Sequence, residues 1–291
     1  MQVLGVGVAT LDIIDTVASY PAEDSKQRAD SRRLCRGGNA ANTLVVLSQL
    51  GHQCSWAGAL ADDASSRQII ADLEIHDIDI RWAKTLREGA TPTSYILLSR
   101  ENSSRTIIHY RDLPEFDSEA YSAIDLTNFD WLHFEGRNVS DCQSMLTLSR
   151  QQEGHARISL EVEQPRNGIE QLFPLADVLL FSRAYADAMG WHDPLELFDA
   201  VRQLNATALL FAAWGDVGGW CRSGERDDHH LPAYHPHRVR DTLGAGDVFN
   251  AGVIHSLSSG LSPHDALHHA IELAGKKCGK IGFDGLGDDC V

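Results

Sequence analysis

Short apolar runs typical of buried strands alternate along this chain with amphipathic runs typical of helices. The strand-like runs are 3–9, 131–134, 158–162, 178–181 and 207–211, and the helix-like runs include 39–50, 142–151, 184–189 and 195–204. Such alternation predicts a mostly parallel central sheet with helices on both faces. Ligands of such sheets bind beyond the carboxyl ends of the strands, where we expect Asp12 and Glu135.

Two parts of the chain depart from this alternation. Residues 93–98 and 105–110 are apolar or β-branched and flank a short polar stretch, which predicts a β-hairpin. Residues 13–36 are strand-like and then polar, so the two parts could form a small β-flap outside the main sheet. The last third predicts two helices, 247–258 and 263–278.

Charge and composition exclude several classes of function. The 291 residues carry a formal net charge of −16, which repels nucleic-acid backbones and anionic membranes. No run reaches the roughly 18 apolar residues of a membrane helix, and the N-terminus does not resemble a signal peptide. The six cysteines form no CxxC pair. We therefore expect a cytoplasmic protein with reduced thiols and without a nucleic-acid or membrane partner.

The glycine-rich segment 241–247 is the strongest chemical motif. Its glycines allow a tight turn and close approach to a ligand, and the helix that follows directs its first amides toward an anion. Asp247 falls in the first turn, where a carboxylate is either a helix cap or a general base. The segment is neither a Walker loop nor a dinucleotide-binding fingerprint.

A second glycine-rich motif covers residues 36–42. Gly37 and Gly38 allow the backbone to approach a ligand, and the side-chain amides of Asn39 and Asn42 can hydrogen-bond hydroxyl groups. The alternative is an ordinary helix N-terminus with Asn39 as its cap.

The two motifs resemble the C-terminal and N-terminal signatures of the ribokinase-like (PfkB-type) sugar kinase family. Further stretches resemble its ketohexokinase subgroup and follow in the expected order, at 135–138, 161–166, 213–216, 274–279 and 282–285. The resemblance implies a three-layer α/β domain over residues 1–291, with a small β-sheet lid from segments near 13–36 and 88–112. Because such lids pair between subunits in relatives, it also implies a homodimer.

The same resemblance implies ATP-dependent phosphorylation of a ketohexose, most specifically of fructose at its 1-hydroxyl. Asp247 would be the general base, and the amides of residues 244–247 would form the anion hole. The remaining implied roles fall to three groups: Gly244, Ala245 and Gly246 around the phosphoryl group; Asp12, Gly38, Asn39, Asn42 and Glu135 at the sugar; and Arg105, Ala213, Trp214, Gly215, Asp216 and Cys278 at the nucleotide. For three of these we keep a plain alternative: Asp12 as a polar strand-end residue, Arg105 as a solvated strand residue and Cys278 as a buried structural thiol.

How Mg²⁺ is held is less defined by the sequence. Many relatives carry an Asn-x-x-Glu motif, whereas residues 181–185 here contain neither residue. We expect Mg²⁺ to bind through ATP phosphates and waters, with Glu163 acting indirectly through water. Glu161 and Glu163 alternate in a predicted strand, so they should share one face, where they could serve the Mg²⁺–water network or the sugar pocket. Surface placement near the strand end is the alternative. A monovalent-cation requirement stays open.

Two rival functions also stay open at this point. The acceptor could be another sugar, a sugar acid or a nucleoside, or the protein could be a non-catalytic sugar- or nucleotide-binding sensor. The histidines grouped at 229–237 and at 264–268 are interpreted as solvated side chains, because clustering in sequence does not establish a metal site.

Overall fold

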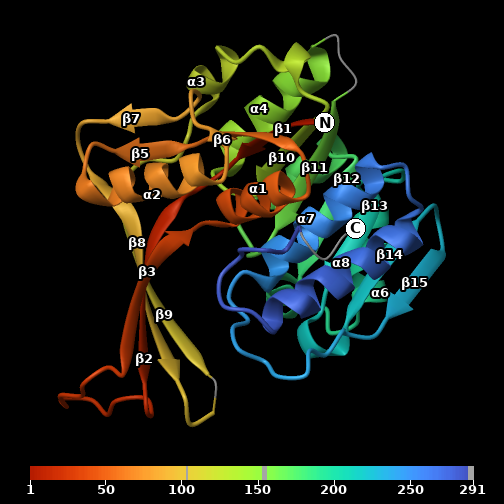
Figure 1. The fold of residues 1–291 in the computed structure, drawn as a ribbon. Helices are drawn as coiled ribbons and strands as arrows, with labels where there is room; N and C mark the ends of the chain where they lie inside the picture. Colours follow the sequence, from red (N-terminus) through yellow and green to blue (C-terminus); the bar gives the residue numbers. More distant parts are fainter. Residues whose placement is uncertain (103, 153–155, 288–291) are drawn as a thin grey trace.

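A nine-stranded sheet forms the centre of the computed structural model, which describes residues 1–102, 104–152 and 156–287 (Figure 1). Its strands lie in the order β15 (Asp227–Leu231), β14 (Gly219–Ser223), β13 (Leu209–Ala213), β12 (Val178–Ser182), β11 (Arg157–Val162), β10 (Trp131–Glu135), β1 (Gln2–Val6), β4 (Gln53–Ala57) and β6 (Ile78–Asp79). Neighbouring strands are parallel except at β13–β14 and β14–β15. The mostly parallel sheet predicted from the sequence is confirmed.

Helices cover both faces of this sheet and enclose two apolar cores. One core takes in α1 (Asn39–Gln49), α2 (Ala64–Ile75), α7 (Ala245–Ser258) and α8 (Pro263–Cys278). The other takes in α3 (Ser118–Ser122), α4 (Val139–Gln151), α5 (Arg183–Ala188) and α6 (Pro194–Arg202), with the 3-10 turns Leu126–Asn128 and Ile169–Leu175. The predicted three-layer α/β architecture is therefore present. Among the described helices, none combines the length and apolar character needed to cross a membrane.

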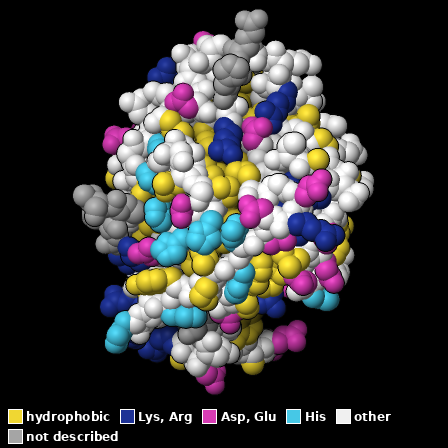
Figure 2. Space-filling model, turned by 90° about the vertical axis from the view of Figure 1, so that its right-hand side faces the viewer, with side chains coloured by type: hydrophobic (Ala, Val, Ile, Leu, Met, Phe, Trp, Pro, Cys, Tyr) yellow, Lys and Arg dark blue, Asp and Glu magenta, His cyan; other side chains and the backbone are white. Residues whose placement is uncertain are grey.

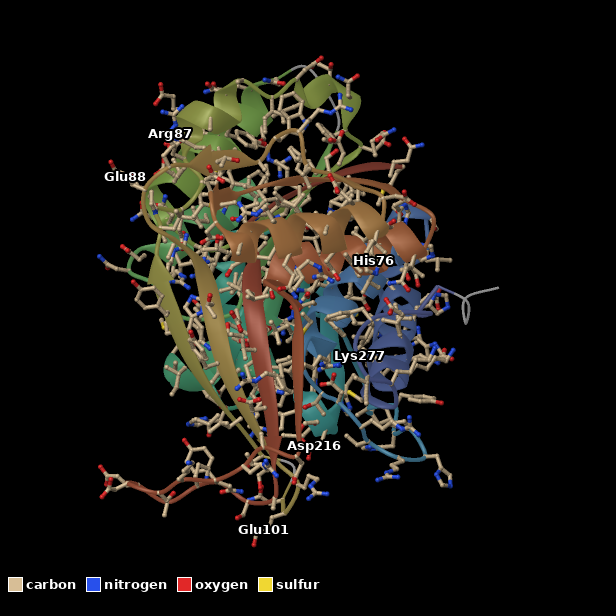
Figure 3. The ribbon with its side chains drawn as sticks, turned by 60° about the vertical axis from the view of Figure 1, so that its left-hand side comes forward. His76, Arg87, Glu88, Glu101, Asp216 and Lys277 are labelled. Carbon is tan, nitrogen blue, oxygen red and sulfur yellow. The ribbon has the colours of Figure 1, made fainter. Side chains whose placement is uncertain are left out.

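A second sheet of four strands projects from the body as a lid (Figure 1). Its order is β3 (Ser31–Gly37), β2 (Thr10–Val17), β8 (Ala90–Ser99) and β9 (Arg105–Asp112), with β2 and β8 parallel and the other pairs antiparallel. Glu101 lies at the far tip of this lid (Figure 3). The short strands β5 (Ala59–Ala61) and β7 (Lys84–Leu86) pair separately near its base.

Four local expectations differ from the structure. The first strand ends at Val6, because the Val8 amide donates to the Glu135 carboxylate at 3.0 Å instead of to a strand backbone. Asp12 consequently lies inside lid strand β2 and not just beyond the first strand. The helix expected from residue 247 begins at Ala245, with Gly244 before it at φ 78°. Glu161 and Glu163 do not share a strand face, since β11 ends at Val162 and Glu163 is exposed beyond it.

Candidate active site

Asp247 occupies the first turn of α7, beneath the lid and at the carboxyl edge of the parallel sheet. Its side chain is only 6% exposed, and its Oδ2 accepts a hydrogen bond from Asn42 Nδ2 at 2.6 Å. Burial raises the pKa of Asp247 well above its ordinary value, and the negative charges of Glu163 and Glu135 raise it further. A carboxylate with a raised pKa and one firm hydrogen bond has the properties of a general base.

Asn42 joins the two glycine-rich motifs that lie far apart in the sequence. While its amide nitrogen donates to Asp247, its Oδ1 accepts from the Arg36 guanidinium. Arg36 is itself buried, and its Nε donates to Asp72 on α2 at 2.6 Å. The orientation of Asn42 is therefore fixed from both ends, as a donor aimed at a reacting carboxylate requires.

A second carboxylate lies on the sheet side of the same site. Glu161 at the end of β11 is 7% exposed, and its Oε1 accepts from Asn39 Nδ2 at 3.0 Å. Its other oxygen, Oε2, is buried without a hydrogen-bond partner. Burial raises the pKa of Glu161 well above its usual range, with the charge of Asp247 as the next cause. A buried oxygen of this kind needs a donor, and a substrate hydroxyl can supply one.

Asp12 enters the site from the lid. Its carboxylate is 7% exposed and accepts from Thr10 Oγ1 at 2.8 Å, and burial raises its pKa. Asp12 and Asn42 line one cavity of about 240 Å³, together with Arg33, Asp241 and Phe283. The carboxylate of Asp12 from the lid and the side-chain amide of Asn42 from the body therefore line the same cavity.

The glycines of the first motif are required by close packing. Gly38 turns the chain from β3 into α1 at φ 98°, and a Cβ there would overlap the Val8 carbonyl oxygen. A Cβ on Gly37 would overlap the Asp12 carboxylate. These two positions therefore bring lid strand and helix start together in a way that no larger residue permits.

The second motif forms a cradle at the start of α7. The first amides of a helix have no partner within it, and the helix dipole makes that end attractive to anions. A Cβ placed on Gly246 would meet nothing within 4 Å, so open space lies directly beside the predicted anion hole. One of the predicted donors is engaged, since the Ala245 amide reaches the Thr242 carbonyl at 3.3 Å.

Arg105 crosses from the lid to this cradle. It begins β9, and its Nη1 donates to Thr242 Oγ1 at 3.1 Å. A second lid arginine, Arg33 on β3, pairs with Asp241 at 3.0 Å. The lid therefore brings two arginines to the loop that would bind phosphate. Because Arg105 is itself exposed, both its phosphate-side role and the solvated alternative stay predictions.

The residues predicted to line the nucleotide follow β13. Ala213 ends that strand, Trp214 is buried against Trp220 with ring centroids 6.0 Å apart, and the exposed residues Gly215 and Asp216 begin a 3-10 turn, Gly215–Val217. Cys278 ends α8, and its carbonyl accepts from the Arg240 amide at 2.8 Å. Cys278 is half-buried, and burial raises the pKa of its thiol, which disfavours a nucleophilic thiolate. Its place at the nucleotide stays a prediction.

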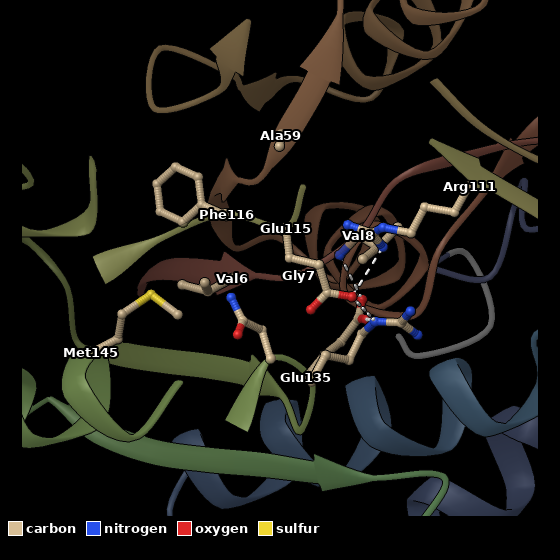
Figure 4. A pocket seen from close by; sticks show the side chains of 11 residues that line it. Val6, Gly7, Val8, Ala59, Arg111, Glu115, Phe116, Glu135 and Met145 are labelled. Atoms are coloured by element: carbon tan, nitrogen blue, oxygen red, sulfur yellow. Dashed lines mark hydrogen bonds and ion pairs between the residues drawn. The ribbon is translucent and has the colours of Figure 1, made fainter. Parts of the chain in front are cut away.

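Glu135, which the sequence places at the sugar, accepts hydrogen bonds from backbone amides in the structure. Its Oε1 accepts from the amides of Val8 at 3.0 Å and Ala40 at 2.7 Å, tying the end of β1 to the start of α1. Figure 4 shows Glu135 and Glu115 turned toward the small cavity beside Gly7, where Arg111 pairs with Glu115 at 3.1 Å. Oε1 of Glu135 therefore holds the backbone, and the role of this residue at the sugar stays a prediction.

Glu163 is placed by a hydrogen bond to its carbonyl. Ser182 Oγ donates to that oxygen at 2.6 Å and also accepts from the Tyr185 amide at 3.0 Å, capping α5. Ser182 stands in the segment that lacks the Asn-x-x-Glu motif, so this segment positions Glu163 instead of supplying a carboxylate. No group of three His, Cys, Asp or Glu residues suited to a metal ion is found in the described parts of the chain.

The histidines gather on the face formed by β14, β15 and α8, where Figure 2 shows a band of imidazole groups. The rings of His229 and His264 meet with centroids 5.0 Å apart, and His229 Nε2 lies 3.1 Å from Asp227. This band lies outside the site built around Asp247.

Fold and site together define a class of protein, the lid-bearing α/β proteins with the ribokinase fold. Ribokinase from Thermotoga maritima has a similar structure, with a TM-score of 0.78 at 21% identity over 98% of this chain and 95% of the other. Ribokinase from Cryptococcus neoformans var. grubii serotype A, solved in complex with ADP, matches with a TM-score of 0.76 at 17% identity over 99% of both chains.

Sequence comparison narrows this class to one family. The family model for pfkB family carbohydrate kinases matches residues 2–285, and ketohexokinase of Mus musculus is 39% identical over 98% of both chains. The chain belongs to the pfkB family of carbohydrate kinases, and the resemblance seen in its two glycine-rich motifs is confirmed.

Two groups in the site have contacts that the sequence alone does not predict. For Glu161 the sequence leaves the Mg²⁺–water network and the sugar pocket open, and its link to Asn39 emerges from the fold. Lys277 is fully buried against the 241–247 loop. A signal for Lys277 does exist, because it continues the buried face of α8 marked by Ala266, Ala270 and Leu273.

Proposed function

We propose that this carbohydrate kinase transfers the terminal phosphoryl group of ATP to a ketohexose, specifically to the 1-hydroxyl of fructose. The observation that carries the proposal is the 2.6 Å hydrogen bond from Asn42 to buried Asp247, which joins the sugar signature to the base. The 39% identity to a ketohexokinase over 98% of both chains supports the ketose as acceptor. We place this activity in a single kinase domain over residues 1–291, working in the cytoplasm.

In the proposed reaction Asp247 accepts the proton of the attacking hydroxyl. Its raised pKa makes the carboxylate a stronger base than an exposed aspartate. Asn42 holds the carboxylate in place, and Asp12, Gly38 and Asn39 orient the remaining hydroxyls. Because these partners are carboxylates and amides, the site favours a polyol over a nucleoside, whose base would require an apolar surface.

The phosphate side relies on positioning and charge. The amides at the start of α7 would stabilise charge on the transferred group, and Arg105 would add a positive charge from the lid. The segment 213–216 and Cys278 would line the nucleotide. A solved relative of the same fold binds ADP, which supports ATP as the donor.

Mg²⁺ fits this site as a partner of the ATP phosphates and water. Glu163, exposed at the end of β11 near Glu161, is the residue we assign to its water shell. The ion would supply charge neutralisation on the phosphates, and the chain would orient that shell through Glu163.

The outer face of the lid supports the proposed homodimer. Leu34, Ile13, Tyr95 and Ile108 form one row across all four strands, and the exposed fractions of Leu34, Tyr95 and Ile108 are 45%, 51% and 62%. The opposite face carries Asp12 and belongs to the site. An exposed apolar row on a sheet with an open edge is suited to pairing with a second copy. Ile108→Glu should therefore lower the mass measured by light scattering to that of one chain, and an unchanged mass would exclude this face.

The test of function is ADP release from magnesium-ATP against fructose, other ketoses, aldoses, sugar acids, ribose and adenosine. Saturable turnover with fructose and a product mapped to the 1-phosphate would establish the proposal. Turnover only with another acceptor would keep the kinase chemistry and refute the ketose assignment. Ligand-dependent thermal stabilisation without ADP release on any acceptor would instead identify a binding-only protein.

A further inference from the structure

Lys277 is the most completely buried charged residue in the described part of the body. It lies in the last turn of α8, in the part of the body that faces the lid (Figure 3), and its side chain is 0% exposed. Burial of an ammonium group is costly unless it is paired and hydrogen-bonded. A lysine buried at this position therefore needs specific hydrogen-bond acceptors and a negative charge close to its ammonium group.

Those partners belong to the phosphate loop. Lys277 Nζ donates to the Asp241 carbonyl oxygen at 2.8 Å and lies 3.5 Å from Asp241 Oδ1. Asp241 in turn accepts from the amides of Leu243 at 3.0 Å and Gly282 at 3.3 Å. The Lys277 ammonium, together with Arg33 of the lid, thus holds the residue at which the segment 241–247 begins.

A second contact links Lys277, through the ring of Phe283, to Gly244 in the middle of the loop. Its Nζ lies 5.5 Å from the centroid of the Phe283 ring, within the range of a cation–π contact. That ring packs so closely on Gly244 that a Cβ on this glycine would collide with it. Gly244 precedes the first helical amides of α7, so its position sets where those amides point.

We infer that the Lys277 ammonium is a built-in cation that holds the 241–247 loop in its phosphate-binding shape. It is a positioning residue, because it acts through Asp241 and Phe283 and does not reach the reacting atoms. The loop's importance for phosphate rests on the proposed function, whereas its order can be measured without any substrate.

The first test replaces the charge while keeping the length, with Lys277→Met. We expect hydrogen exchange of the amides in 241–247 to accelerate, and kcat to fall roughly 10- to 100-fold, as for other residues that support a reacting group. The KM for the sugar should stay near the wild-type value. Lys276→Met is the matched control, because Lys276 pairs with Glu272 on the same helix at 2.9 Å and such partly exposed pairs contribute little.

The second test restores the charge without the covalent link. Lys277→Ala leaves a cavity that propylammonium can fill, while propanol fills it without charge. Recovery of slow loop exchange and of kcat with propylammonium, and not with propanol, would establish the positioning role. Equal recovery with both would show that Lys277 acts only by filling space and would overturn the inference.

Two further outcomes separate this inference from the proposed function. If the amides of 241–247 exchange at the wild-type rate in Lys277→Met, the inference is overturned whatever the substrate. It is also overturned if hydrogen exchange accelerates throughout the molecule and thermal stability falls generally. If no sugar is phosphorylated by the wild-type protein, the exchange and rescue measurements still decide the role of Lys277, and only the ketohexose proposal fails.

Discussion

Replacement of Asp247 by asparagine separates the chemical role of this carboxylate from its structural one. The asparagine keeps an oxygen that can accept from Asn42 Nδ2, so the hydrogen bond now 2.6 Å long can persist. It removes the only group we assign to take the hydroxyl proton. General acid–base catalysis is worth about 10²- to 10⁴-fold, or about 3 to 5 kcal/mol of activation free energy. We expect kcat to fall by that factor.

The stability of the same variant should change in the opposite direction. Because burial raises the folded-state pKa of Asp247 above its unfolded value of 3.8, the ionised form destabilises the fold. That cost is absent below pH 3.8 and is complete above the raised pKa. Asp247→Asn should therefore melt at the wild-type temperature in acid and at the same or a higher temperature near neutral pH.

The assay is ADP release with saturating magnesium-ATP and sugar, beside a thermal melt of each variant. Asp187→Asn is the control, since Asp187 lies on α5 in an ion pair with Arg183 at 3.3 Å. Turnover of Asp247→Asn within about tenfold of wild type, with a normal melt, would fall below the range for a general base and refute the role.

The pH profile gives an independent reading of the same group. The acidic limb of kcat/KM should lie above pH 3.8, because Asp247 must be ionised to act and its pKa is raised. Glu163 is one cause of that elevation, so Glu163→Gln should move the limb to lower pH. Glu225→Gln, in the exposed turn between β14 and β15, should leave it unchanged. A limb that is insensitive to Glu163→Gln would contradict this electrostatic account.

Three further variants test the loops around the site. Arg105→Gln removes the 3.1 Å bond to Thr242 and should raise the KM for ATP about tenfold, the effect of losing roughly 1.4 kcal/mol of charge-assisted bonding, while leaving the melt unchanged. Gly38→Ala should destabilise the protein by about 2 kcal/mol or more in urea titration, whereas Gly51→Ala, at φ 86° with no atom within 4 Å of its Cβ, should cost clearly less. Gly246→Ala should melt normally but lose turnover, because its methyl group would enter the open space left for phosphate.

The parallel sheet was accessible from the sequence because its strands are short apolar runs that are buried on both faces. Strands such as 158–162 and 178–181 appear in the structure within a residue of the predicted limits. The lid pairing was not accessible in the same way. Strands β2 and β8 pair in parallel, Ile13 beside Tyr95, although helices α1 and α2 lie between them in the sequence. No local pattern specifies such a partner.

The candidate site also has parts that could be predicted from the sequence and parts that could not. The two glycine motifs were visible because the residue types that a tight turn requires occur together in sequence. The roles of individual polar side chains were harder to predict, because each role depends on which residue, distant in the sequence, is its hydrogen-bond partner. Glu135 illustrates this: its position at a strand end is typical of a ligand-binding residue, yet its Oε1 is taken by two backbone amides. Only the three-dimensional contacts reveal that one oxygen of this carboxylate holds the backbone.

In the proposed mechanism, the contact between Asn42 and Asp247 also means that acceptor binding and base strength are not independent. Burial and the charges of Glu163 and Glu135 raise the pKa of Asp247, whereas the hydrogen bond from Asn42 lowers it. Arg36 fixes Asn42 for that task and is itself anchored to Asp72 on a different helix. A change in the sugar motif therefore alters the proton affinity of the base as well as the shape of the acceptor site.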